Sequence, residues 1–179
     1  MDKVSPRFTP PRDERYLGLA WTMASFSKDP NTQVGAVIIL PEENEPLGWG
    51  YNGPPAALDD NKDVNWARPH KYDFIKHAEE NAIDHSSRSL NGAHLYVTHM
   101  PCKKCMLKII DAKITRVVYT DLAKKDPNSS IGNSNSEKEF IEELAYCGGV
   151  QLEKFEGNLG WLPDWVEELK GLGLFEISK

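Results

Sequence analysis

Apolar positions follow two rhythms along the chain, one typical of amphipathic helices and one typical of buried strands. Residues 13–24 place apolar side chains at helical spacing, and Pro30 disfavours helical geometry just before it. A continuous apolar run at 34–40 predicts a buried strand. Residues 41–46 predict a turn into a second strand at 47–51. The domain is therefore expected to begin with a helix followed by a β-hairpin.

Strands and helices alternate through the rest of the chain. Further strands are expected at 94–98, 117–119 and 150–155. Further helices are expected at 77–85, at 101–112 and at 136–148, the last ended by two glycines. Alternating helices and strands after a hairpin favour a mixed sheet with helices on both faces. The predicted fold class is α/β, a three-layer α/β/α architecture around a five-stranded mixed sheet.

Four segments depart from this alternation. The proline-rich residues 1–11 predict an extended arm, and residues 126–136, rich in Asn and Ser, predict a surface loop. Residues 54–76 form a long irregular insert, and loops of that length are often functional. Residues 157–179 predict a C-terminal extension that packs on the domain. We expect one domain over the whole chain.

The composition narrows the class of protein. Of the 179 residues, 40% are hydrophobic and 27% are charged, which is typical of a globular domain. The apolar runs are too short for a membrane span, and the N-terminus carries no apolar signal segment. Three cysteines favour a reducing compartment, so we expect a cytoplasmic protein, in a host cytoplasm if it is viral. The net charge of −6 argues against nucleic acid as a partner.

Two short motifs carry the candidate chemistry. His77 precedes Glu79 by two residues at a predicted helix start, and Cys102 and Cys105 lie three residues apart at another. Catalytic zinc takes three protein ligands and keeps an open position, and His77, Cys102 and Cys105 supply three. Cysteines three apart share a helix face, and a helix start favours the thiolate. Glu79 projects beside the metal, where a carboxylate can move protons between an attacking water and a leaving group.

The same residues also allow plainer interpretations. A C-x-x-C pair can be a redox centre, but that pair normally follows the first strand of its fold, whereas this one is in mid-chain. Cys147 is interpreted as a small buried residue of the helix at 136–148. The remaining histidines are interpreted as surface or structural residues; they are His70, His85, His94 and His99.

The pattern H-x-E followed by P-C-x-x-C is a known signature of zinc nucleobase deaminases. Over residues 12–155 the chain resembles the deoxycytidylate deaminases of the cytidine-deaminase superfamily. The resemblance rests on the two motifs and on segments 27–36, 50–53 (Gly-Tyr-Asn-Gly) and 95–98, with Trp66 and Arg68 in the insert. It implies hydrolysis of dCMP to dUMP and ammonia, which supplies dUMP for dTMP synthesis, with one catalytic zinc per chain.

The resemblance also implies regulation and assembly. Members are commonly homohexamers that dCTP activates and dTTP inhibits, at a site built partly from Tyr51, Asn52 and Gly53. Triphosphates at that site would need Mg²⁺ to offset their charge. We expect a positive φ or a close backbone approach at Gly50 and Gly53, and the alternative is a plain hairpin end.

The resemblance assigns substrate contacts as well. Asn52 would contact the sugar, and the backbone N–H of Ala78 would hold the pyrimidine carbonyl. Lys28 and Asn31 lie where the family places nucleotide contacts, although Lys28 equally fits a solvated loop charge. The chain departs from some relatives in having no cysteine before Cys102, which rejects a second zinc site, and in lacking a tyrosine soon after the strand at 117–119.

Three functions stay open at the level of the sequence. The first is deamination of dCMP. The second is a deaminase that acts on free cytidine or deoxycytidine, or on a base within a polynucleotide. The third is a catalytically silent nucleotide-binding regulator on the same fold, against which the intact Glu79 argues.

Overall fold

The computed structural model describes residues 10–58, 62–67, 69–120, 135–157 and 159. Several sequence predictions lie outside these residues. They are most of the arm at 1–11, Arg68, most of the loop at 126–136, and nearly all of the extension at 157–179. No helix among the described residues has the length and apolar content needed to cross a membrane.

Five strands form one mixed sheet in the order β2-β1-β3-β4-β5. Strand β1 (Gly35–Leu40) pairs antiparallel with β2 (Glu45–Tyr51) on one side and with β3 (His94–Val97) on the other. Strand β4 (Arg116–Tyr119) runs parallel to β3, and β5 (Gln151–Lys154) runs parallel to β4. The five-stranded mixed sheet expected from the sequence is confirmed.

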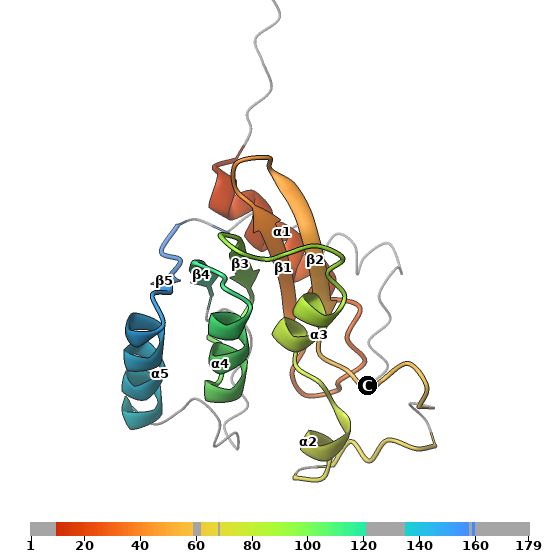
Figure 1. Cartoon of the computed structure of the whole chain (residues 1–179). Coiled ribbons are helices and arrows are strands. Elements are labelled where there is room, and N and C mark those ends of the chain that lie inside the picture. Colours follow the sequence, from red (N-terminus) through yellow and green to blue (C-terminus); the bar gives the residue numbers. More distant parts are fainter. Residues whose placement is uncertain (1–9, 59–61, 68, 121–134, 158, 160–179) are drawn as a thin grey trace, which may run out of the picture.

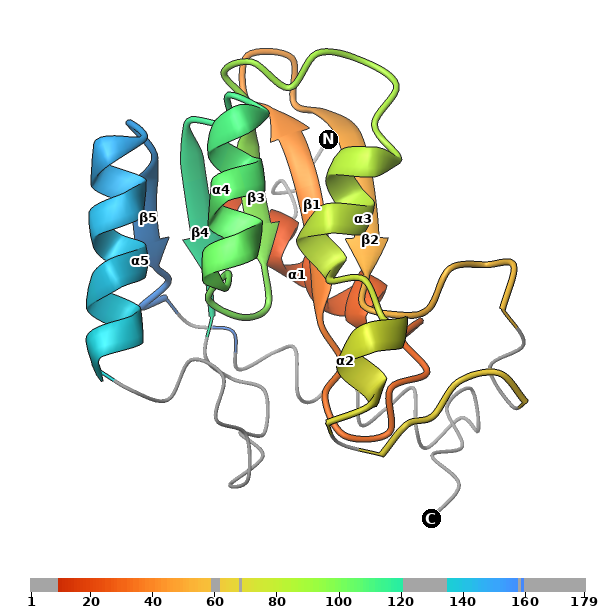
Figure 2. The same ribbon diagram turned by 60° about the horizontal axis from the view of Figure 1, so that its bottom comes forward.

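Helices cover both faces of the sheet (Figure 1). Helix α1 (Arg12–Ala24) lies on one face, and α3 (Ala78–Asp84), α4 (Lys103–Asp111) and α5 (Asn135–Cys147) lie on the other (Figure 2). A short helix, α2 (Lys71–Phe74), was not expected, because it interrupts a stretch without helical periodicity. The three-layer α/β/α fold is confirmed.

The continuous apolar run in β1 is explained by its two covered faces. Ala36 and Ile38 are buried in the core shared with α3, α4 and α5, whereas Val37 and Ile39 are buried in the core shared with α1. Because side chains alternate along a strand, a strand covered on both faces is apolar at every position. β1 therefore holds the two helical layers together.

The interpretation of Cys147 as a buried residue is wrong. Cys147 is the last residue of α5 and its side chain is exposed. Helix α5 buries Ile141 and Ala145 in the core, and Cys147 lies outside that apolar face.

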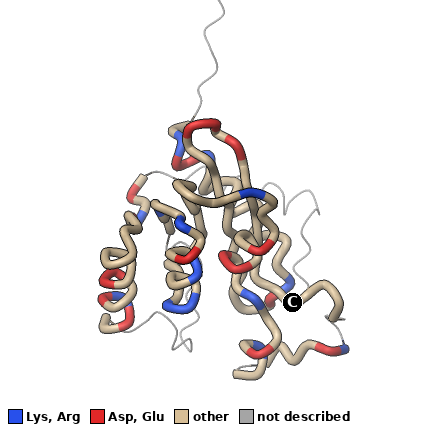
Figure 3. The backbone as a smooth tube through the Cα atoms, in the orientation of Figure 1, with Lys and Arg blue, Asp and Glu red and all other residues tan. Residues whose placement is uncertain are grey.

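Figure 3 shows acidic and basic positions interspersed over the described elements, with basic positions on α4 beside acidic positions on α3.

Candidate active site

His77 occupies the position directly before helix α3. Its backbone is extended (φ −74°, ψ 158°), so the residue occupies the N-cap position of the helix. The preceding Lys76 pairs with Gly53: the Gly53 amide donates to the Lys76 carbonyl at 3.1 Å, and the Lys76 amide donates back at 2.9 Å. This bridge ties the start of α3 to the end of β2 and fixes the position of His77.

Cys102 and Cys105 lie at the start of helix α4, directly after Pro101. Cys102 is the capping residue, with an extended backbone (φ −74°, ψ 168°), and Cys105 is the third residue of the helix. We expected both cysteines within the first turn of the helix. Cys105 lies there, but Cys102 lies one residue before the helix begins. An extended residue directly before the first turn can still turn its side chain toward the face that Cys105 occupies, and Cys105 is fully buried.

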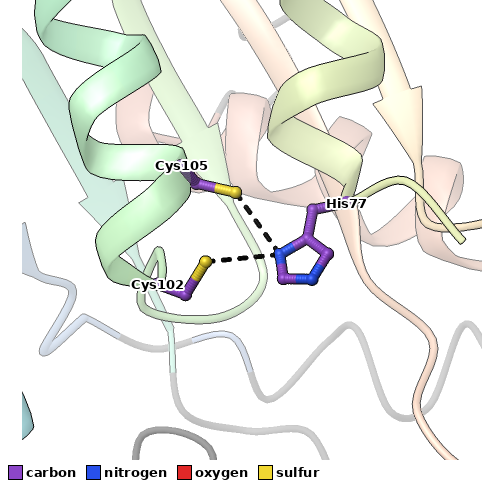
Figure 4. A group of neighbouring side chains, drawn as sticks. All are labelled: His77, Cys102 and Cys105. Carbon is purple, nitrogen blue, oxygen red and sulfur yellow. Dashed lines mark hydrogen bonds between the residues drawn. The ribbon is translucent and has the colours of Figure 1, made fainter. Parts of the chain in front are cut away.

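The three predicted ligands meet at one point (Figure 4). The His77 Nδ1 atom lies 3.5 Å from the Cys102 Sγ atom and 3.3 Å from the Cys105 Sγ atom. The three ligand atoms all lie within 4.8 Å of one another. One imidazole nitrogen and two sulfurs are donors that suit Zn²⁺, and three of them leave one coordination position free. The residues present therefore fit a catalytic zinc site.

The protonation of the three groups is coupled. The hydrogen bond from Cys105 lowers the pKa of the Cys102 thiol to about 4, with a further contribution from His77. The hydrogen bond to Cys102 raises the pKa of His77 to about 9, although burial opposes that shift. The bond to Cys102, together with burial, raises the pKa of Cys105 well above its usual value. Metal ligands must be thiolates and neutral imidazole, so a bound cation would displace protons from Cys105 and His77.

Glu79 is the second residue of α3, and only 4% of it is exposed. Burial raises the pKa of its carboxyl group, while the His77 charge acts in the opposite direction. The Cys102 thiolate also acts on this carboxyl group electrostatically. The structure therefore places the predicted proton carrier inside the protein, in the electrostatic surroundings of the candidate ligands.

An ion pair between α3 and α4 was missed by the sequence analysis. Glu80 accepts a hydrogen bond from the backbone N–H of His77 at 3.2 Å through its Oε2 atom. Its Oε1 atom lies 3.3 Å from the Nζ atom of Lys104, which lies between the two cysteines in the sequence. The two helices that carry the candidate ligands are thus linked by charge as well as by packing. The sequence signal for it is the opposite charge of the two motifs, with two adjacent glutamates after His77 and two adjacent lysines after Cys102.

Gly50 and Gly53, where a close backbone approach or a positive φ was expected, differ in their surroundings. A Cβ atom at Gly50 would lie 2.4 Å from the Ala78 carbonyl oxygen, so the expected close backbone approach is present there. Gly53 is not among the residues with positive φ, and a Cβ atom would meet only the Tyr51 ring at 3.8 Å. The expectation of a steric need for glycine at 53 is therefore wrong. Tyr51 is 40% exposed, and its ring lies against that of Phe26.

Asn52 is 5% exposed and its amide is engaged inside the protein. Its Oδ1 atom accepts from the Val34 backbone N–H at 2.7 Å, and its Nδ2 atom donates to the Thr32 carbonyl at 2.9 Å. The structure thus gives Asn52 a role in fixing the loop before β1. Lys28 and Asn31 belong to the same loop and are exposed, so their assignment as nucleotide contacts stays a prediction.

Comparison with known proteins identifies the same region of the chain. A family model described as "Cytidine and deoxycytidylate deaminase zinc-binding region" matches residues 10–121. An "uncharacterized deaminase in luxG 3′ region" of Aliivibrio fischeri is 43% identical over 104 residues, which are 58% of this chain and 69% of that protein. The human deoxycytidylate deaminase is 39% identical over 113 residues, which are 59% of this chain and 62% of that protein.

Solved structures extend the likeness beyond the matched segment. The crystal structure of a dCMP deaminase from the cyanophage S-TIM5 in apo form has a TM-score of 0.60 and 26% identity, and the match covers 83% of this chain and all of that chain. The same enzyme in complex with dCMP and dUMP has a TM-score of 0.60 and 25% identity, with the same coverage. The fold expected from the sequence is the fold of these structures.

Proposed function

Because the chain belongs to the cytidine and deoxycytidylate deaminase zinc-binding family, we propose that it catalyses the hydrolytic deamination of dCMP to dUMP and ammonia. The expected family is confirmed, and the named relatives are deaminases, which is the class of enzyme that was expected. The meeting of His77, Cys102 and Cys105 beside a buried Glu79 is the single observation that carries the proposal.

His77, Cys102 and Cys105 would hold one zinc ion per chain. When bound, the metal supplies a Lewis acid that makes water a better nucleophile near neutral pH. The protein's part is to hold the two thiolates and the imidazole nitrogen in place. Helix packing supports this, because Cys105 is fully buried and His77 is fixed from both sides by the Gly53–Lys76 bridge and by α3.

Glu79 would carry the protons of the reaction. Its carboxylate would take one proton from the attacking water and give it to N3 of the cytosine ring. It would then take the proton of the new C4 hydroxyl group and deliver it to the departing amino group. The bond from C4 to the water oxygen forms, and the bond from C4 to the amino nitrogen breaks, so dCMP and water become dUMP and ammonia. Burial of Glu79 supports this role, because a group that is shielded from solvent exchanges its proton with the substrate rather than with bulk water.

The substrate contacts are the least constrained part of the proposal. The Ala78 backbone N–H would hold the pyrimidine carbonyl, Asn52 would contact the sugar, and Lys28 and Asn31 would lie near the phosphate. Ala78 is the first residue of α3 and is therefore adjacent to both His77 and Glu79. An Asn52 oxygen that accepts one backbone hydrogen bond keeps a second lone pair, which fits a donor such as a sugar hydroxyl.

We extend the proposal to regulation by nucleotides. dCTP would activate and dTTP would inhibit, each with Mg²⁺, through a site that includes Tyr51, Asn52 and Gly53, in an assembly of six chains. The partly exposed Tyr51 ring supports a nucleotide contact, because bases stack on aromatic rings. A dCMP saturation curve that is sigmoidal alone and becomes hyperbolic with dCTP is expected. A hyperbolic dCMP saturation curve that neither dCTP nor dTTP changes would reject regulation.

A cytoplasmic location of the protein stays a prediction.

The test of the proposed function is ammonia release from dCMP by the zinc-loaded protein. Glu79→Gln keeps the shape of the side chain and removes its proton chemistry, so turnover is expected to fall by about 10²–10⁴-fold while zinc content stays the same. More than a tenth of wild-type turnover in this variant would reject the role of Glu79. Turnover of deoxycytidine or of a cytosine-containing oligonucleotide in preference to dCMP would favour the alternative substrate class.

A further inference from the structure

A fully buried ion pair joins the long insert to the loop before β1. The Lys71 Nζ atom donates to the Asp29 carboxylate at 2.7 Å (Oδ2) and 3.0 Å (Oδ1), and the two side chains are 2% and 1% exposed. Lys71 begins helix α2 in the insert, whereas Asp29 lies between α1 and β1. A buried charge is costly unless it is paired, so neither residue tolerates the loss of the other.

The ion pair continues into the amide of Asn52. The Asn52 Nδ2 atom donates to the Asp29 Oδ2 atom at 3.3 Å. An ionised carboxylate can only accept hydrogen bonds, so Asp29 selects the orientation in which the Asn52 nitrogen faces it. The Asn52 oxygen is then left to the Val34 backbone N–H at 2.7 Å. The Asp29 carboxylate, whose charge Lys71 balances, and the Thr32 carbonyl at 2.9 Å therefore both favour the same orientation of the Asn52 amide.

The pair lies close to the candidate metal centre along the chain and through hydrogen bonds. Asn52 directly precedes Gly53, which forms the backbone bridge to Lys76, and Lys76 directly precedes His77. The bridge closes one end of the insert. The Ile75 backbone N–H donates to the Lys71 carbonyl at 3.1 Å, so Lys71 and His77 are joined by one short ordered segment. The same segment thus carries the buried ammonium at one end and a candidate zinc ligand at the other.

We propose that Lys71 is a positioning residue, which through Asp29 locks residues 69–76 of the insert onto the loop at 27–34 and helps to hold the Asn52 amide in its binding orientation. Lys71 touches neither the metal ligands nor the reacting atoms in this account. Its loss allows Asp29 to turn toward water and the insert to separate from the loop. The fraction of molecules with a formed binding site then falls, and apparent affinity falls by the same factor, whereas turnover from the saturated site is retained.

The kinetic part of the test rests on the proposed function, since it uses dCMP as substrate. Lys71→Met is expected to raise the KM for dCMP at least tenfold, to leave kcat within about threefold, and to leave zinc content at one per chain. Lys138→Met removes a half-exposed lysine of α5 and is expected to leave KM and kcat unchanged. An unchanged KM, or a loss in kcat alone, in folded Lys71→Met would overturn the proposal.

A double variant separates positioning from stability. Asp29→Asn with Lys71→Met leaves no unpaired buried charge, so its thermal stability is expected to recover above that of Lys71→Met. The insert is still not tied to the loop, so the KM is expected to stay raised. Recovery of the KM together with stability would show that the pair is only structural, and would overturn the proposal.

Amide hydrogen exchange on the wild-type protein tests the same lock without any turnover. The Thr32 amide donates to Asp29 and the Ile75 amide donates to the Lys71 carbonyl, so one opening event exposes both. Their protection factors are expected to agree within about threefold and to fall together in Lys71→Met. Protection that differs by more than tenfold in the wild type would overturn the lock. If the wild type fails to deaminate dCMP while these two amides open together, the proposed function fails and the lock stands.

Discussion

The backbone of Gly50 packs against the first turn of α3 so closely that a Cβ atom on Gly50 would lie 2.4 Å from the Ala78 carbonyl oxygen. Ala78 lies between His77 and Glu79, so β2 contacts the helix at the point where the candidate chemistry begins. The position of β2 and the geometry of the candidate site around His77 and Glu79 are therefore linked through Gly50, which has no side chain.

Gly50→Ala is expected to destabilise the protein and to disturb zinc binding. The added methyl group meets backbone atoms rather than a flexible side chain, so α3 must shift, and such overpacking costs about 1–3 kcal/mol of the free energy of unfolding. Urea unfolding and zinc content measure both effects. Gly53→Ala is the control, because its Cβ atom would meet only the Tyr51 ring at 3.8 Å, and its unfolding is expected to match the wild type. Equal stability of both variants would contradict the packing argument.

Cys105→Ala is expected to lose zinc, because two of the three donors cannot hold the ion tightly. Cys147→Ser, which changes an exposed cysteine on α5, is expected to keep one zinc per chain. Metal analysis of the two purified variants, side by side with the wild type, decides the matter. Full zinc content in Cys105→Ala, or two zinc ions per wild-type chain, would contradict the assigned ligands.

The Asp13–Arg116 pair predicts a dependence of stability on pH. Arg116 donates to both Asp13 oxygens at 2.9 Å, and this hydrogen bonding lowers the pKa of Asp13 despite partial burial. A lowered pKa in the folded state means that the stabilisation is complete above the unfolded-state pKa of about 4 and is lost as pH falls through the folded value. Asp13→Asn is therefore expected to cost about 1–2 kcal/mol at pH 7 and progressively less below pH 4.

Urea unfolding at pH 7 and at pH 3 measures that difference. The control is Asp111→Asn, an exposed position at the end of α4, which is expected to change stability by less than about 0.5 kcal/mol at either pH. A penalty for Asp13→Asn that is as large at pH 3 as at pH 7 would show that the carboxylate charge is not what stabilises the contact.

The candidate metal ligands could be singled out because the information within each motif is local. Two cysteines three residues apart, and a histidine two residues before a glutamate, define their own geometry once each motif starts a helix. The layers of the fold were likewise predictable, because the periodicity of apolar residues in a strand or helix can be recognised within a short stretch of sequence. The buried run of β1 shows this most plainly, since both of its faces are apolar.

The long-range polar contacts could not be predicted. Lys71 lies in an irregular insert, where a lysine is normally solvated, and its partner Asp29 is 42 residues away in the sequence. The exposure of Cys147 follows from helical spacing, because it lies off the face that Ile141 and Ala145 turn to the core. The ordinary backbone of Gly53, by contrast, depends on its bridge to Lys76, which periodicity does not report. Pairing of charges across loops is decided by the tertiary fold, so such residues are visible only in the structure.

The most direct test of the account is one rate comparison with the zinc-loaded protein. Release of ammonia is measured from dCMP, from deoxycytidine and from a single-stranded oligonucleotide that contains cytosine, at equal cytosine concentration. We predict that kcat/KM for dCMP exceeds the other two by at least a hundredfold, because the proposed site binds a nucleoside monophosphate. Comparable values for dCMP and deoxycytidine, or a preference for the oligonucleotide, would contradict the account.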